Sequence, residues 1–215
     1  MENDITLTSG FIINPNKSKI IIDGTYNNVK STYTNNLESL EGNVIKASTK
    51  NKEIILKNMN IISSSGYGVI YVPSHPNYSN VVVEYNNVNF TGIELSQNYY
   101  GTTKIIDSVI EVKDTNNVLA QRACDSNKVL IGGNTSINSS AVDKPVIFLN
   151  DVIPSTLKIM PNSKVTITTK EELMNGTNRL DLIVGHGAEF LLTTGNGFSI
   201  TTTHGARNVL IEEEA

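Results

Sequence analysis

Residues 54–61 read IILKNMNI, and residues 81–90 read VVVEYNNVNF. In both stretches a short alternation of apolar and polar residues leads to an Asn and then resumes. Alternation with a period of two is typical of a β-strand that buries one side, and Asn is typical of tight corners. The two stretches therefore predict short strands that meet at a corner occupied by Asn.

The same pattern recurs along the chain. Further copies read SKIIIDGTYNNV from Ser18, TKIIDSVIEV from Thr103, NKVLIGGNTSI from Asn127, TLKIMPNSKVTI from Thr156, LDLIVGHGAEFLL from Leu180 and RNVLIEEEA from Arg207. One apolar residue marks each of the eight copies: Ile20, Ile54, Val83, Ile105, Val129, Leu157, Leu182 and Val209. The gaps between markers are 34, 29, 22, 24, 28, 25 and 27 residues, which indicates a repeat protein.

Stacking explains why one unit repeats. A short strand cannot bury its apolar side alone, whereas strands stacked at about 4.8 Å bury a continuous core. The period is too short for propeller blades of about 40 residues. We therefore predict an all-β fold, a single-stranded right-handed parallel β-helix of about eight rungs that forms one domain over residues 1–215. Asn58 and Asn87 are expected to stack in a column at one corner.

Three segments depart from the repeat. KEELMNGTN from Lys170 is the one plausible helical turn, with Gly176 placed to stop it. Asp23–Gly24 and Asn175–Gly176 are candidates for hairpin turns. The long first gap, which contains YTNNLESLEGN, is the expected site of an inserted loop.

Composition restricts the class of protein. The formal net charge of −4 is mild and the arginines are scattered, which argues against a nucleic-acid partner. No run of 18 apolar residues occurs, so no membrane-spanning segment is expected. Cys124 is the single cysteine, which excludes an internal disulfide and a cysteine-based metal cluster. We expect a monomer.

The repeats resemble the pectate-lyase-like adhesive domains on large surface proteins of Gram-positive bacteria. The stretches that carry the resemblance are VVEYNNVNFTGIELSQNYYGTTKIIDSVIEV, AQRACDSNKVLIGGNTSI, STLKIMPNSKVTITT and LIVGHGAEFLLTT. The resemblance implies a right-handed β-helix, an extracellular location at the cell surface or wall, and a role in adhesion or as a stalk. The chain shows no export or sorting signal, so we expect a domain excised from a longer surface protein.

A polysaccharide lyase is the main alternative. Such an enzyme needs calcium held by carboxylates and a positioned Arg or Lys as base. Arg122, with Asp125 and Lys128 nearby, is the best candidate base, but a polar loop explains it more simply. Glu171 and Glu172 are better explained as a solvated helical start. We therefore predict no catalytic residues and no cofactor; acids with bound calcium beside Arg122 would favour the lyase.

The remaining candidate metal or nucleophilic residues have structural explanations. His186 and His204 each precede Gly-Ala and are expected at turns, without a third ligand for zinc. Cys124 is expected to be a small, partly buried residue and not a nucleophile. We therefore predict no metal site.

Aromatic residues gather between Tyr67 and Tyr100, in loops one turn apart. Aromatic rings stack on sugar faces, and Tyr is common at recognition surfaces generally. The predicted site for a glycan or a host-surface ligand consists of Tyr71, His75, Tyr78, Tyr99, Tyr100 and Arg122. A purely structural stalk is the other alternative, and it would be favoured if these rings proved buried.

Overall fold

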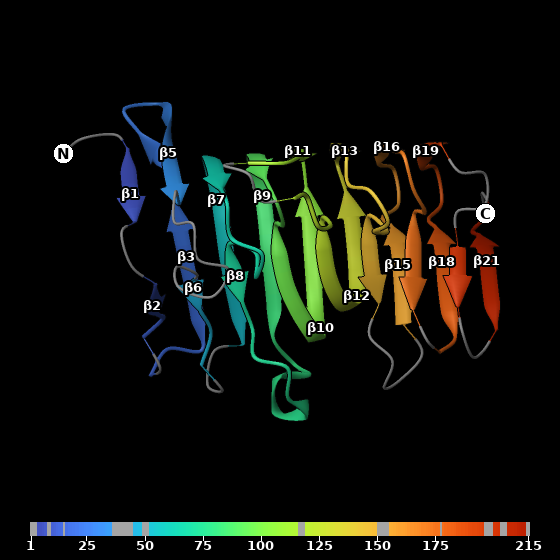
Figure 1. Ribbon diagram of the computed structural model, residues 1–215, viewed down its shortest axis with the longest axis horizontal. Helices are drawn as coiled ribbons and strands as arrows, with labels where there is room; N and C mark the ends of the chain where they lie inside the picture. Colours follow the sequence, from blue (N-terminus) through green and yellow to red (C-terminus); the bar gives the residue numbers. More distant parts are fainter. Residues whose placement is uncertain are drawn as a thin grey trace.

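The computed structural model describes residues 4–7, 10–14, 16–35, 45–48, 52–115, 119–149, 155–176, 178–195, 200–202 and 206–213. Their regular secondary structure is all β-strand, apart from a short 3-10 helix, η1 (Pro76–Tyr78). Parallel strands stack along the long axis as a β-solenoid of about six turns, with the N- and C-terminal strands at opposite ends (Figure 1). The all-β class and the parallel stacking are confirmed.

The strands form three faces, which the chain visits in turn. Face 1 contains β3 (Lys19–Asp23), the first parts of β7 (Glu53–Ser63) and β9 (Val82–Gly92), the second parts of β10 (Ser96–Ile106) and β12 (Cys124–Gly132), then β15 (Ser155–Ile159), β18 (Leu180–Val184) and β21 (Arg207–Ile211). Face 2 contains β1 (Ile5–Leu7), β5 (Val29–Asn35), the second parts of β7 and β9, then β11 (Val109–Val112), β13 (Asn134–Ser139), β16 (Lys164–Thr169) and β19 (Glu189–Thr194). Face 3 contains β2 (Phe11–Ile12), β6 (Ile45–Lys46), β8 (Ile70–Tyr71), the first parts of β10 and β12, then β14 (Ile147–Leu149), β17 (Met174–Gly176) and β20 (Ile200–Thr202).

The strand register on face 1 follows the sequence markers closely. Ile20 pairs with Ile54, and Ile54 with Val83. Val129 pairs with Leu157, Leu157 with Leu182, and Leu182 with Val209. The marker Ile105 was wrong, because Thr103 pairs with both Val83 and Val129. Ile105 points to the same side two residues later, where it pairs with Tyr85 and Ile131.

The corner between faces 1 and 2 needs a left-handed backbone conformation. Asn58, Asn87, Asp107 and Asn162 have φ between 49° and 56°, and Gly133 and Gly187 take their place on other turns. Asn and Asp tolerate this conformation better than other residues with a side chain.

The predicted Asn column is confirmed at this corner. Asn87 Nδ2 donates to Asn58 Oδ1 at 2.9 Å, and Asn58 Nδ2 donates to Asp23 Oδ1 at 3.1 Å. The Thr25 N–H, Lys57 and Asn58 together hold the pKa of Asp23 well below its usual range. The column therefore joins three successive turns by side-chain hydrogen bonds.

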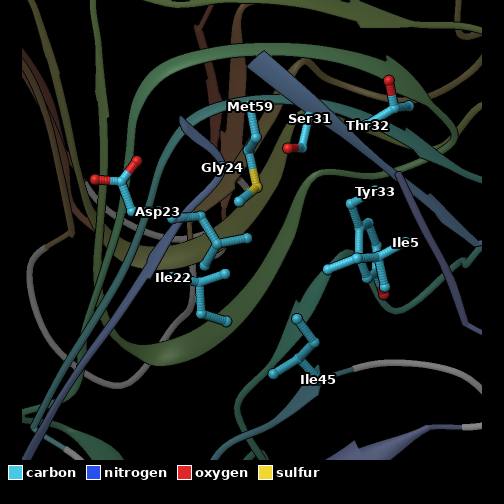
Figure 2. A pocket seen from close by; sticks show the side chains of 10 residues that line it. Ile5, Ile22, Asp23, Gly24, Ser31, Thr32, Tyr33, Ile45 and Met59 are labelled. Carbon is cyan, nitrogen blue, oxygen red and sulfur yellow. The ribbon is translucent and has the colours of Figure 1, made fainter. Parts of the chain in front are cut away.

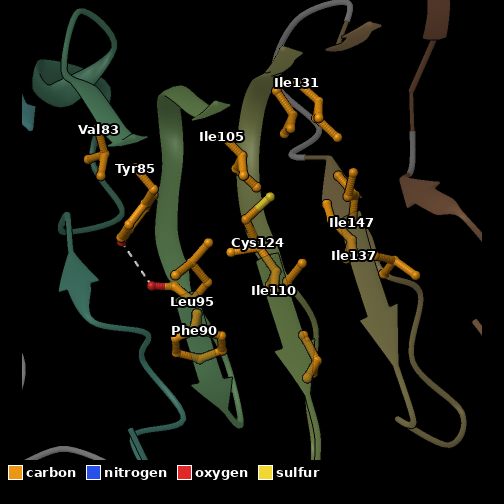
Figure 3. Packing of buried hydrophobic residues seen from close by; sticks show 14 of the residues in the cluster. Val83, Tyr85, Phe90, Leu95, Ile105, Ile110, Cys124, Ile131, Ile137 and Ile147 are labelled. Carbon is orange, nitrogen blue, oxygen red and sulfur yellow. Dashed lines mark hydrogen bonds between the residues drawn. The ribbon is translucent and has the colours of Figure 1, made fainter. Parts of the chain in front are cut away.

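Inward-pointing residues from all three faces form one core. One apolar ladder, formed by Ile61, Phe90, Ile110, Ile137 and Ile167, runs along it through the register of face 2. Figure 3 shows the middle of this core, with Tyr85 fully buried and its hydroxyl donating to Leu95 O at 2.9 Å. Each turn thus buries its apolar side against the turns before and after it.

Two local predictions were wrong. Residues 170–173 form bends and residues 174–176 form β17, so the expected helical turn after Lys170 is absent. Neither Asp23–Gly24 nor Asn175–Gly176 makes a hairpin. The hairpin joins β4 (Thr25–Tyr26) to β5 through Asn27 and Asn28, both at positive φ, as a two-residue loop of this kind requires.

This hairpin lies between the markers Ile20 and Ile54 and accounts for part of the long interval of 34 residues between them. The expected insertion there falls mostly outside the described residues. None of the described helices is long and apolar enough to cross a membrane.

Substituting Asn87 tests the corner. Asn87→Ala removes the hydrogen bond to Asn58 and places a residue that tolerates positive φ poorly, so we expect a loss of about 1–2 kcal/mol in the free energy of unfolding. Asn87→Gly also removes this hydrogen bond, but Gly adopts positive φ readily, so the free energy of unfolding should fall by less. The control Asn89→Ala removes an exposed bond to Asn60 elsewhere on face 2. Urea unfolding measures all three; equal losses for Asn87→Ala and Asn89→Ala would contradict the role of the corner.

Candidate functional site

Face 3 carries a row of outward-pointing side chains. In its register Lys46 lies beside Tyr71, Gln97 beside Asp125, and Asp125 beside Phe148. The Val72 N–H donates to Gln97 O at 2.8 Å, which joins the strand of Tyr71 to that of Gln97. The row continues from Phe148 through Asn175 to Thr201.

Five residues in and just before the middle strands of this row, β10 and β12, make the face 3 cluster: Glu94, Gln97, Tyr99, Arg122 and Asp125. Arg122 Nη1 donates to Asp125 Oδ1 at 2.7 Å, and its guanidinium lies 5.0 Å from the ring centre of Phe148. Gln97 Nε2 donates to the Tyr99 hydroxyl at 3.0 Å. Parallel stacking thus unites residues that lie 31 positions apart at the extremes (Glu94 and Asp125).

The cluster is buried yet incompletely hydrogen-bonded. Glu94 and Asp125 are each only 2% exposed, and Gln97 is 6% exposed. Three buried atoms of the cluster have no hydrogen-bond partner: Glu94 Oε1, Gln97 Oε1 and Arg122 Nε. Unpaired buried polar atoms are rare in folded proteins because each loses its hydration without compensation. Their concentration here makes this the leading candidate for a binding site.

Burial controls the protonation of the cluster. Loss of hydration, followed by repulsion from Asp125, raises the pKa of Glu94 well above its usual value. Burial also raises the pKa of Asp125, although the adjacent Arg122 partly offsets this. Burial and the two nearby acids raise the pKa of Tyr99 to about 12. Burial therefore favours the protonated form of Glu94, whereas Asp125 has Arg122 as a direct ion-pair partner.

Polar contacts extend the row towards the C-terminal end. Glu172 Oε2 accepts a hydrogen bond from Asn175 Nδ2 at 3.0 Å, and Glu172 Oε1 accepts one from Thr201 Oγ1 at 2.6 Å. Glu172 is half-buried. It belongs to the polar row of face 3, so its interpretation as the start of a solvated helix was wrong.

The structure places three of the predicted site residues along face 3. Tyr99 and Arg122 belong to the cluster, and Tyr71 lies one turn away. The Tyr71 ring is half-buried, makes an edge contact with Tyr67 at 5.3 Å between ring centres, and has Lys46 Nζ at 5.8 Å.

The other three predicted residues lie elsewhere. His75 is exposed and caps η1, where its Nδ1 accepts from the Asn77 N–H at 3.2 Å. Tyr78 packs against the core. Tyr100 lies in the irregular part of β10, between faces 3 and 1, where the pairing with β12 shifts register.

Sequence reasoning missed Glu94, Gln97 and Phe148 as site residues. The register supplied only part of the signal, because the alignment of Val129 with Thr103, carried back by four residues, brings Asp125 to Tyr99. The register shift between Asn98 and Thr102 places Asp125 beside Gln97 instead. The burial of Glu94 had no such signal, because it depends on how the segments that precede β10 and β12 pack together.

A small cavity lies near the N-terminal end of the solenoid. Figure 2 shows this cavity of about 80 Å³, lined mainly by apolar residues, among them Ile5, Ile22, Tyr33, Ile45 and Met59. Burial raises the pKa of Tyr33 to about 12, and its hydroxyl has no partner. The volume is well below the roughly 300–1,000 Å³ of typical ligand pockets. We therefore take face 3 as the candidate site.

The described residues contain no group of three or more His, Cys, Asp or Glu side chains that could hold a metal ion. His186 lies in the turn that contains Gly187, and its carbonyl accepts from the Asn162 N–H. His204 lies outside the described residues. Cys124 points into the core, where burial raises the pKa of its thiol well above the usual value, as suits a structural cysteine.

Comparison with known proteins gives no assignment. No protein-family model, no curated protein and no solved structure matches this chain.

Replacing Glu94 with Gln tests the protonation of the cluster. Unfolded Glu94 titrates near its ordinary value of 4.5, whereas the folded protein keeps it protonated to higher pH. Between these two pKa values the folded state holds more protons, so the free energy of unfolding falls as pH rises, and this fall ends above the folded pKa. The pKa of Asp125 is also raised, chiefly by burial, so this residue likewise makes the free energy of unfolding fall as pH rises. Glu94→Gln should reduce the slope.

Urea unfolding at pH steps from about 4.5 to 8 measures this slope. The matched control is Glu111→Gln, which removes a carboxylate that is 46% exposed on face 2. A slope that is the same in the wild-type protein and in Glu94→Gln would contradict the assignment of the proton to Glu94.

Proposed function

We propose that this protein is a non-catalytic, glycan-binding module and that face 3 is its binding surface. The observation that carries the proposal is the face 3 cluster, in which unpaired polar atoms lie beside the aromatic rings of Tyr99, Tyr71 and Phe148. Aromatic faces and fixed polar groups in one row suit a sugar chain, which presents apolar ring faces and hydroxyl groups alternately.

The geometry of a solenoid supports an extended ligand. The outward row from Tyr71 to Thr201 runs across successive turns at about 4.8 Å each, so its length greatly exceeds one sugar unit. A rigid row of this kind suits a polymer better than a small molecule.

The broader setting is part of the same proposal. We take the protein to be an extracellular module of a surface protein, on the strength of the resemblance of its rungs to adhesive domains. We also take the winding to be right-handed, because crossover connections between parallel strands are right-handed in nearly all proteins. The eight strand segments that pair in series on face 1 support a count of about eight rungs, some of them incomplete.

A carbohydrate-active enzyme is the second candidate. The pairing of Glu94 with Asp125 beside Arg122 favours it, because glycosidases and lyases use paired acids. Two observations argue against it. Both carboxyl groups are almost fully buried, and Asp125 and Glu94 raise the pKa of Arg122 despite its burial, which makes it a poorer base.

Alanine substitution of the aromatic residues tests glycan binding. Tyr71→Ala and Tyr99→Ala should each weaken binding to a polysaccharide selected from a broad glycan array by about tenfold, because each removes a stacking surface. Isothermal titration calorimetry measures the affinity. Thr168→Ala, on face 2, is the matched control and should leave it unchanged. The proposal fails if no glycan on the array binds, or if neither Tyr substitution weakens binding.

A further inference from the structure

The free hydrogen-bonding atoms of the face 3 cluster define the chemistry of its ligand. Arg122 Nε is a donor, Gln97 Oε1 is an acceptor, and Glu94 Oε1 belongs to a carboxyl group that holds a proton. A group that pairs with both a donor and an acceptor must itself be able to donate and accept. A hydroxyl group does so, whereas a carboxylate or sulfate accepts only.

The positive charge of Arg122 is already paired with Asp125 inside the protein. Its Nη1 contacts Asp125 at 2.7 Å, and its guanidinium stacks over Phe148. The cluster therefore has one cation and one ionised acid in direct contact, and no free positive charge. An acidic sugar that approached Arg122 would have to compete with Asp125.

The charges elsewhere along face 3 are of mixed sign. Lys46 lies over Tyr71, Lys144 lies close enough to Glu94 to lower the pKa of that acid, and Glu172 follows beyond Phe148. This pattern lacks the block of like charge that binds polyanions in other proteins.

We propose that the ligand of face 3 is an uncharged glycan, whose hydroxyl groups pair with Glu94, Gln97 and Arg122. This inference rests on the proposed function. The three unpaired atoms are buried, and the Arg122 side chain, which carries one of them, is 16% exposed. Binding therefore requires a side chain such as Arg122 or Tyr99 to move so that a hydroxyl group can enter, and the hydrogen bonds that then form favour the bound state.

Calorimetry with size-matched neutral and acidic polysaccharides tests this inference. Dextran and galactan serve as neutral probes, and polygalacturonate and hyaluronan as acidic ones. We expect a neutral probe to bind at least about tenfold more tightly than either acidic one, with little change in affinity between about 50 and 500 mM NaCl. Tight, salt-sensitive binding of an acidic probe would overturn the inference while the proposed glycan-binding function stood.

Substitutions inside the cluster supply an independent readout. Gln97→Leu removes an acceptor and should weaken binding of the neutral probe by about tenfold. Glu94→Gln keeps the shape and a donor, so it serves as the second variant if Gln97→Leu unfolds, and it should alter affinity by less. Neutral binding that Gln97→Leu leaves unchanged, in a folded variant, would overturn the inference. Absence of binding to every probe and to the glycan array would overturn both proposals together.

Discussion

Each turn of this molecule is held by backbone hydrogen bonds to the turn before it, and every other feature depends on that pairing. Because the strands are parallel and keep their register apart from the shift in β10, a residue lies beside its equivalent on the next turn, about 4.8 Å away. Similar residues therefore form ladders, apolar ones inside and Asn at a corner, and the outer sides carry ion pairs between paired residues such as Lys19–Glu53 and Lys164–Glu189. A shift of one residue would turn each apolar ladder outward, so the buried core fixes the register.

Function is assigned to face 3 because most of the buried polar atoms without a hydrogen-bond partner gather there. Among the described residues, seven buried side-chain atoms lack a hydrogen-bond partner, and five of them belong to Glu94, Ser96, Gln97, Asn98 and Arg122. The outer side of face 2 instead carries a mixed row that runs through Thr34, Ile62, Thr91, Glu111, Asn138 and Thr168. Unsatisfied groups are thus concentrated where β10 and β12 begin, and not spread along the solenoid.

Much of the fold was predictable because its signal is local and repeated. Asn58 and Asn87 marked a corner, and seven of the eight apolar markers proved to be equivalent positions. The choice of Ile105 as a marker was wrong because a pattern with a period of two cannot distinguish residues 103 and 105, which point to the same side of the strand. The hairpin at Asn27–Asn28 was missed because Asp23–Gly24 offers a stronger turn pattern only a few residues earlier.

The site was less predictable, since it depends on contacts between turns. Aromatic clustering pointed to Tyr71 and Tyr99, and a lone Arg in a polar loop pointed to Arg122. The same reasoning also selected His75, which caps a short helix, and Tyr78, which packs against the core. Glu94 was not predicted because nothing in ELSQNYY indicates that this acid is buried, or that it interacts electrostatically with an acid 31 residues later.

A disulfide cross-link between adjacent turns tests the register most directly. Lys128 and Thr156 are paired on the outer side of face 1, at a separation that a disulfide can span, and Cys124 is too deeply buried to compete. The double variant Lys128→Cys with Thr156→Cys should oxidise fully within one chain and remain folded. Leu130→Cys with Thr156→Cys, two residues out of register, should cross-link poorly. Mass spectrometry under non-reducing conditions distinguishes them, and more efficient cross-linking of the second pair would contradict the stacking on which this account rests.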